Sequence, residues 1–455
     1  MASASEQLAA NMNLGVFSKA KELQKRLLFT LMILVVYRIG TFVPIPGMDM
    51  EAFQAAFGSG TSGGGLLDRF NMFSGGAVER MAIFALNVMP YISASIIMTL
   101  LKGSVASLKE LDKDGEQGRK QINQYTRYLT VFLAAFQAFG IARALQGTEG
   151  AVINPGLFFQ ASTVITLVGG TMFLMWLGEQ VTARGVGNGV SLIIFAGIVA
   201  ELPKALFQLF GMNQSGEIGE ALLAILIVMF IGLIMLIVYV ERAQRRLRVQ
   251  YPKRQMAGGK QFGGENSFMP LKLNTAGVIP PIFASSLLLL PATFGQIFVG
   301  GDGAASGIMG TVLAYLGYGS PTYLVLYGLL IIFFCYFYVP YVFKPDDVAD
   351  NLRKNGGFLP GIRPGQRTAE YLSYVLSRLT FIGAIYVAFV CVLPEAFIAR
   401  SGNIPVSVAM LIGGMSLLII VSVTLDTVAQ IQSHLIAHQY EGLIKKSRMR
   451  RRNKT

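Results

Sequence analysis

Residues 221–240 read ALLAILIVMFIGLIMLIVYV, 20 consecutive residues without a charged side chain. An α-helix of about 20 apolar residues crosses the hydrocarbon core of a bilayer, whereas such a run suits no turn or loop. Five further runs contain no charged residue. Four shorter runs are less apolar, and they can cross if the helix tilts or if flanking charged side chains snorkel to the membrane surface. The charge-free runs are 81–101, 157–177, 273–295, 322–343 and 403–425, and the shorter ones are 24–43, 128–142, 186–200 and 379–394. We therefore expect ten membrane spans.

The composition supports a membrane protein and excludes several other classes. Of 455 residues, 53% are hydrophobic and 14% are charged, about half the charged share of a soluble domain. Cys335 and Cys391 both lie in apolar runs, so we expect neither a disulfide framework nor a cysteine metal site. The N-terminus lacks the pattern of a cleaved signal peptide, and the first apolar run is expected to be retained. The sequence predicts an all-α polytopic membrane protein.

Lysine and arginine give the expected orientation, because they accumulate in cytoplasmic loops. With ten spans both termini share a side, and that side receives 32 of the 38 lysines and arginines. Both termini are therefore expected in the cytoplasm. Attraction to anionic lipid and the bias of basic residues toward the cytoplasm are enough to explain the charge of the tail KKSRMRRRNKT at 445–455.

Two expected cytoplasmic loops, 241–272 and 344–372, carry more positive charge than orientation requires. QRRLRVQY at 244–251 alternates basic and apolar residues, which predicts one strand of a projecting hairpin. NGGFLPGIRPG at 355–365 places Arg363 on a stiff Gly/Pro turn. Anionic lipid is one partner for such loops, and a large anionic or acidic docking partner is the sharper hypothesis.

Enzyme and cofactor motifs are absent from the sequence. There is no GxxxxGK[ST] phosphate loop and no HExxH, and the glycine-rich RGVGNGVS at 184–191 begins a span instead of following a strand. His434 and His438 are four residues apart and could share a metal, but no third ligand is evident. We expect no enzyme, no cofactor and no metal site.

Polar residues are sparse inside the expected spans, which bears on transport. A secondary transporter places ionisable groups at mid-membrane, whereas Arg38, Glu179 and Asp426 lie near span ends. The interior polar residues include Ser93, Gln137, Asn188 and Asn274, for which helix–helix hydrogen bonding is the ordinary role. The sparse polarity inside the spans fits a path for a chemically unspecific substrate better than it fits a path for one ion. A secondary transporter and a scaffold for membrane assembly remain the alternatives.

The segment GGGLLDRFNMFSGGAVERMAIF at 63–84 contains a short amphipathic stretch between glycines. Leu66, Leu67, Phe70 and Phe73 share one helical face, but the stretch is far too short to span a bilayer. By itself it predicts either an interfacial turn or a mobile apolar stub.

Several motifs, in order along residues 20–445, together resemble the SecY family, the central subunit of the bacterial protein-conducting channel. They are FVPIPG (42–47), FNMFSGGAVERMAIFALNVMPYISASII (70–97), INQYTRY (122–128), GTMFLMWLGEQ (170–180), GVGNGVSLIIFAGIV (185–199), AGVIPPIFASS (276–286) and NGGFLPGIRPG (355–365). The resemblance implies ten helices in the bacterial plasma (inner) membrane, arranged as two inverted-repeat halves around a central pore. The halves would be 1–205 and 206–455, with helices 1–5 in the first and 6–10 in the second.

The resemblance also implies roles for particular residues. A re-entrant plug helix would comprise Leu66, Leu67, Asp68, Arg69, Phe70, Asn71, Met72, Phe73 and Ser74. An aliphatic pore ring would comprise Val88, Ile92, Val190, Ile194, Ile282 and Ile419, although aliphatic i, i+4 pairs are ordinarily packing. Ser93, Gln137 and Asn274 would form a polar patch at a lateral gate between helices 2–3 and 7–8.

The implied partners account for the basic loops. Arg363 would contact the motor and the ribosome, and the other loop would face ribosomal RNA phosphates through Arg245, Arg246, Arg248, Lys253 and Arg254. The family works with SecE-like and SecG-like small membrane subunits and with a SecA-like motor ATPase. Its substrates are unfolded preproteins with their signal sequences, which cross the membrane or leave sideways into lipid.

Overall fold

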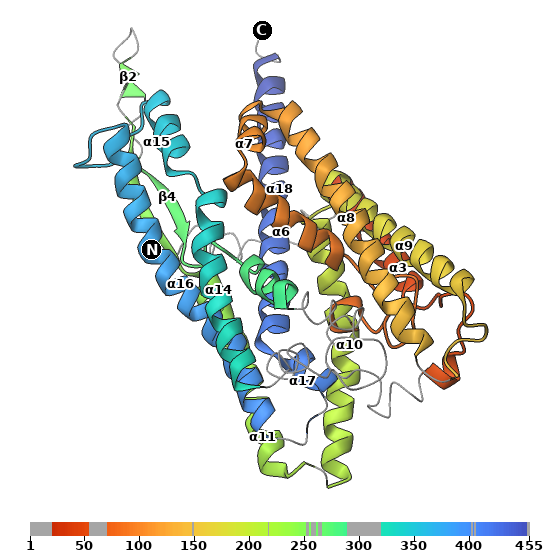
Figure 1. Cartoon of the computed structure of the whole chain (residues 1–455). Helices are drawn as coiled ribbons and strands as arrows, with labels where there is room; N and C mark the ends of the chain where they lie inside the picture. Colours follow the sequence, from red (N-terminus) through yellow and green to blue (C-terminus); the bar gives the residue numbers. More distant parts are fainter. Residues whose placement is uncertain are drawn as a thin grey trace. The chain divides into compact units, whose positions relative to one another are not determined.

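The computed structural model describes residues 21–53, 71–147, 150–216, 218–251, 254–255, 261–262, 266–288, 320–401, 404 and 406–452, and these residues are mostly helical (Figure 1). The chain forms two compact units, one of residues Met1–Pro203 with Val423–Thr455 and one of Lys204–Ser422. Some expected features lie outside the described residues: residues 66–70 of the plug, Lys253 of the basic loop, residues 289–295 of one span, and residues 403 and 405 of another.

The first unit is a set of long packed helices. Helix α6 packs along α8, α8 packs along α9, and α3 contacts α9, as their side-by-side ribbons show (Figure 1). The helices are α3 (Lys21–Gly40), α6 (Met89–Ser104), α7 (Ala106–Lys113), α8 (Glu116–Gln146), α9 (Leu157–Arg184), most of α10 (Gly189–Gln214) and the second part of α18 (Gly414–Arg452). The neighbouring contacts α6–α8–α9 follow chain order, as short connections between antiparallel helices require.

The second unit combines helices with a small sheet. Helix α14 packs along α16, and α15 contacts the first part of α16. The helices are α11 (Glu220–Arg242), Ile279–Leu288, α14 (Pro321–Val342), α15 (Pro345–Lys354), α16 (Gln366–Ser401) and α17 (Val406–Ile412). Strand β1 (Gln244–Gln250) pairs antiparallel with β4 (Asn266–Lys272), and β2 (Arg254–Gln255) pairs with β3 (Gln261–Phe262).

Each of the ten expected spans contains a helix in its described part. Among the described residues, seven helices are long and apolar enough to cross a membrane, or eight if α6 and α7, bent by 101° at their junction, form one broken span. The other two are α3, which has charged residues near both ends, and Ile279–Leu288, which is short in its described part. Several helices run past the apolar cores that predicted them, as in α8, which begins at Glu116 instead of 128.

One span boundary in the expectation was wrong. The run 81–101 was expected to be one span, but residues 75–88 form successive turns, and α6 begins only at Met89. Gly75 and Gly76 have φ of 65° and 79°, a left-handed conformation that interrupts a helix and that glycine adopts without strain. Pro90 then occupies the first turn of α6, where its missing N–H costs no helical hydrogen bond.

Local capping explains where two spans begin. The side-chain oxygen of Asn188 accepts from the backbone N–H of Val190 at 3.1 Å and of Ser191 at 3.3 Å, which caps α10. Asn188 was expected to hydrogen-bond between helices, but its side-chain oxygen bonds the start of its own helix instead. Ser320 caps α14 in the same way through Tyr323, with Pro321 at the first helical position.

Helix α9 approaches the turn segment 75–88 closely at Gly170. A Cβ added at Gly170 would overlap the carbonyl oxygen of Ile83 and lie 3.0 Å from its carbonyl carbon. The adjacent Gly169 has no heavy atom within 4 Å of the same added Cβ. Small residues of this kind let backbones touch, which is a main source of packing energy between membrane helices.

These two glycines give a matched test of the packing. Gly170→Ala is expected to destabilise the protein by about 1–3 kcal/mol because a methyl group has no space against Ile83. Gly169→Ala should be neutral or stabilise by up to about 1 kcal/mol, since alanine favours a helix interior. Thermal unfolding in detergent, followed by fluorescence of Trp176, the chain's one tryptophan, measures both. Equal melting of the two variants would contradict this account of the contact.

Candidate functional site

Residues 71–76 form a buried segment at the start of the turn region. Asn71–Ser74 make one helical turn, and Gly75 and Gly76 follow it. Phe73 and Ser74 are 1% and 0% exposed. These residues include the last four of the expected plug. Inside an apolar protein interior their backbone carbonyls need partners other than water.

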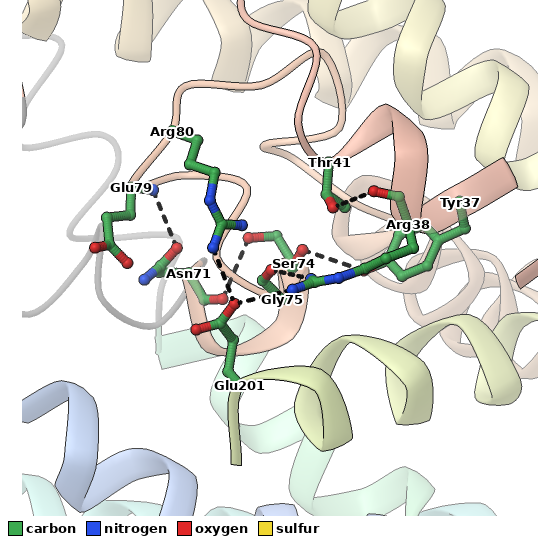
Figure 2. Close-up of polar contacts among 9 residues, drawn as sticks. All are labelled: Tyr37, Arg38, Thr41, Asn71, Ser74, Gly75, Glu79, Arg80 and Glu201. Carbon is green, nitrogen blue, oxygen red and sulfur yellow. Dashed lines mark hydrogen bonds and ion pairs between the residues drawn. The ribbon is translucent and has the colours of Figure 1, made fainter. Parts of the chain in front are cut away.

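Three side chains from neighbouring segments supply those partners, and Figure 2 shows two of them, Tyr37 and Arg38. The Tyr37 hydroxyl donates to the carbonyl of Ser74 at 3.1 Å, and the Arg38 guanidinium donates to the carbonyl of Gly75 at 2.7 Å. The side-chain amide of Asn87 donates to the carbonyl of Phe73. The end of the 71–74 turn is therefore held by side-chain donors at three consecutive carbonyls.

Glu201 of α10 lies next to this segment and is 5% exposed. Its Oε1 atom is 3.5 Å from a guanidinium nitrogen of Arg38 and 3.5 Å from one of Arg80 (Figure 2). Both guanidinium groups also lie over the ring of Phe42, at 5.1 and 4.4 Å from its centroid. We call Glu201, Arg38, Arg80 and Phe42 the charge cluster. One buried carboxylate faces two cations here, so the carboxylate is fully compensated.

Sequence reasoning missed the charge cluster. Arg38 was expected only to lie near a span end, and Glu201 fell just beyond the run 186–200 that was counted as a span. An acidic residue directly after an apolar run, on the same expected side as Arg38 and Arg80, was the available signal. That signal could not indicate which arginine pairs with Glu201, because the three residues are distant in sequence.

The expected ring residues are buried, apart from the half-buried Val190. In the first unit Val88 is 0% exposed and its carbonyl accepts from the N–H of Ile92 at 3.0 Å, so these two lie one helical turn apart. Val190 and Ile194 lie one turn apart near the start of α10. In the second unit Ile282 and Ile419 are each buried, in the helix Ile279–Leu288 and in α18.

The three expected gate residues have different surroundings. Ser93 of α6 and Gln137 of α8 are buried, and the Gln137 side-chain oxygen has no hydrogen-bond partner among the described residues. The Asn274 amide donates to Glu241 at 2.7 Å and to the carbonyl of Gly277 at 3.2 Å. Asn274 thus joins the end of α11 to the turn that precedes the helix Ile279–Leu288.

The two basic loops fold as one body, which we call the loop module: strands β1 and β4 together with the turn 355–365. Gln250 and Phe358 exchange two backbone hydrogen bonds of 2.9 and 3.0 Å, joining the end of β1 to the turn. A hydrophobic core lies beneath. It consists of Leu247, Val249, Leu271, Leu359, Leu372, Val375 and Leu379. The predicted hairpin strand and the predicted turn are both confirmed, and their junction is an added finding.

The loop module presents its basic side chains to solvent. Arg246 and Arg248 are exposed, while Leu247 and Val249 between and after them are buried, as alternation along a strand requires. Arg245 is also exposed, and the backbone of Arg254 lies in β2. Arg363 is exposed between Gly361 and Gly365, which have φ of 81° and 107°. Its carbonyl accepts from the Thr368 hydroxyl at 3.0 Å, which helps to fix the turn.

The helices and this basic surface define a multi-pass α-helical membrane protein with a folded loop module. Comparison with known proteins narrows the class. The SecY family model matches residues 82–428. The chain is 48% identical to the protein translocase subunit SecY of Rickettsia conorii, over 95% of this chain and 99% of the relative. It is also 48% identical to that of Escherichia coli K12, over 94% and 95%. The chain belongs to the SecY family.

Solved structures agree on the fold. One is a structure of SecY whose plug domain stabilises the closed state of the translocation channel. It has a TM-score of 0.64 and 19% identity, and the match covers 90% of this chain and 92% of that one. Another, of Sec61 in the canine ribosome–channel complex, has a TM-score of 0.61 and 18% identity over 90% and 92%. The chain is thus a protein-conducting channel subunit of the Sec translocon, in a family of channels and not of enzymes.

The shared core of the loop module gives a test. Val249→Ala should weaken the module by about 2 kcal/mol, because it removes buried methyl groups from the core. Hydrogen exchange followed by mass spectrometry should then speed up in both peptides 244–250 and 355–362. Arg246→Ala, at an exposed position of the same strand, should change neither. Faster exchange in only one of the two peptides would show that they are separate loops.

Proposed function

We propose that this chain is a passive pore for unfolded polypeptides, sealed by an aliphatic ring and opened by a partner that supplies the energy. The pore passes preproteins across the bacterial plasma membrane and releases apolar segments sideways into lipid. Both termini lie in the cytoplasm, as the distribution of lysine and arginine supports. The two halves 1–205 and 206–455 surround the pore.

The observation that carries the proposal is the chemistry of the ring residues. All six are Val or Ile, and five of them are buried: Val88, Ile92, Ile194, Ile282 and Ile419. A ring of aliphatic side chains excludes water and hydrated ions, yet it forms no strong bond with a passing side chain. Such a ring suits a substrate whose sequence varies continuously. The plug, Leu66–Ser74, covers the ring from the outer side in this proposal.

The charge cluster argues against a secondary transporter. A transporter holds a carboxylate ready to exchange a proton or cation near the membrane centre. Glu201 instead faces Arg38 and Arg80, so a cation would have to displace two fixed positive charges. This carboxylate is structural in the proposal.

The loop module is the docking surface for the energy source. Exposed arginines on a strand and on a rigid turn can bind acidic side chains or phosphates at fixed positions. The partners are a SecA-like motor ATPase and the ribosome, whose RNA phosphates would meet Arg245, Arg246 and Arg248. The Sec61 relative in a ribosome–channel complex supports this assignment. SecE-like and SecG-like subunits would complete the membrane assembly, and Ser93, Gln137 and Asn274 would line the lateral gate.

The ring is tested by Ile282→Asn. An amide in the seal favours a hydrated open form, and about 1.4 kcal/mol of bias shifts the open population tenfold. Resting ion conductance in planar bilayers and export of a preprotein with a defective signal peptide should rise together. Leu287→Asn, on the same helix but 43% exposed, is the matched control and should raise neither. An ion-tight Ile282→Asn channel would mean that this residue is ordinary packing.

The docking surface is tested by Arg363→Glu. Charge reversal on the rigid turn should reduce motor-driven export into vesicles by about tenfold or more, because the partner's anionic group is repelled. The amount of protein assembled in the membrane should stay unchanged. Arg367→Glu, exposed four residues later at the start of α16, should have a much smaller effect. Near-normal export by Arg363→Glu would contradict the assignment of this residue.

A further inference from the structure

We infer that Glu201 is a positioning residue that holds residues 71–76 in their buried place by keeping Arg38 directed at the carbonyl of Gly75. The inference concerns the described residues of the first unit. Its link to channel sealing rests on the proposed function, because that proposal assigns residues 71–74 to the plug. The positioning itself does not depend on that assignment.

Arg38 contacts both the segment and Glu201. One guanidinium nitrogen donates to the carbonyl of Gly75 at 2.7 Å, and the other lies 3.5 Å from Glu201. The planar fork of arginine makes both contacts at once, so the carboxylate fixes the direction of the donor. Without the carboxylate, Arg38 and Arg80 would be two neighbouring cations on one aromatic ring, and mutual repulsion would separate them.

Glu201 also lies directly against the segment. An added Cβ at Gly76 would overlap the Glu201 carboxylate, and one at Gly75 would lie 2.8 Å from the Cα of Gly197. Gly197 and Glu201 are one turn apart on α10. The backbone of residues 75–76 therefore rests on one face of α10, with Gly197 supplying space and Glu201 supplying charge.

The other side-chain bonds to this segment come from uncharged donors. Tyr37 and Asn87 hold the carbonyls of Ser74 and Phe73, but both are neutral donors. Hydrogen bonds from charged groups are stronger than neutral ones, especially at low exposure. Loss of the Glu201 charge should therefore release Gly75 first and leave the helices around it packed.

The experiment measures the accessibility of residue 74. Ser74→Cys is made in a chain with Cys335→Ala and Cys391→Ala, so that residue 74 carries the only thiol and all labelling reports on it. The purified channel, with the subunits that accompany it in mild detergent, is reacted with a polar maleimide. Ser74 is 0% exposed, so slow labelling is expected with Glu201 intact. Glu201→Gln should speed it by about ten- to a hundredfold, as expected when a buried charge loses its partner.

Controls separate local release from general unfolding. Glu201→Asp keeps the charge and should label at close to the original rate. Glu179→Gln removes the carboxylate of an exposed pair with Arg127, whose bonds are 3.2 and 2.6 Å, and should not affect labelling at 74. Ala134→Cys reports on the buried side of α8 and should stay unlabelled in Glu201→Gln.

Two outcomes would overturn the inference: slow labelling of residue 74 in Glu201→Gln, or faster labelling of residues 74 and 134 alike. Resting ion conductance of the same variants tests the plug separately. A rise in conductance along with labelling supports both ideas. Faster labelling at 74 alone with an ion-tight channel supports the positioning role of Glu201 and overturns the assignment of residues 71–74 to the seal.

Discussion

Hydrocarbon cannot hydrogen-bond to a peptide group, and every buried N–H and C=O of this chain has to be satisfied within the protein. In the long helices the backbone meets this requirement by itself, because each carbonyl accepts a hydrogen bond from the N–H of the residue four positions later. Residues 75–88 depart from helix, and the carbonyls at the end of the preceding helical turn need help from side chains. The donors on Tyr37, Arg38 and Asn87 meet that need at three consecutive carbonyls. The departure from helix and the polar side chains therefore depend on one another.

The same requirement explains the buried charge. Arg38 is useful as a donor to Gly75, but an isolated guanidinium is costly in a poorly hydrated interior. Glu201 offsets that cost, and the ring of Phe42 contacts both guanidinium groups.

The loop module is ordered in a different way. Its residues meet water, so a small hydrophobic core beneath β1 and the 355–365 turn orders the loops and leaves the arginines free for contacts.

Glycine determines how closely the parts of the first unit approach. Gly170 admits the carbonyl of Ile83, and Gly197 admits the backbone of Gly75. In each pair a single methyl group would separate the backbones, which is why membrane helices favour small residues at contacts. The exposed Gly169 beside Gly170 shows that the residue type alone carries no such information.

The sequence alone determined the class, the number of apolar runs, the strand at 244–250 and the turn around Arg363, because each depends on neighbouring residues or on a short period. Motif order along the chain also indicated the SecY family. Only the tertiary structure placed the start of α6 at Met89, joined Gln250 to Phe358, and brought Glu201 to Arg38 and Arg80. The start of α6 was hidden because residues 81–101 read as one uninterrupted apolar run. The other two features unite residues that are far apart in the chain, and periodicity within one segment contains no record of which distant segment it will meet.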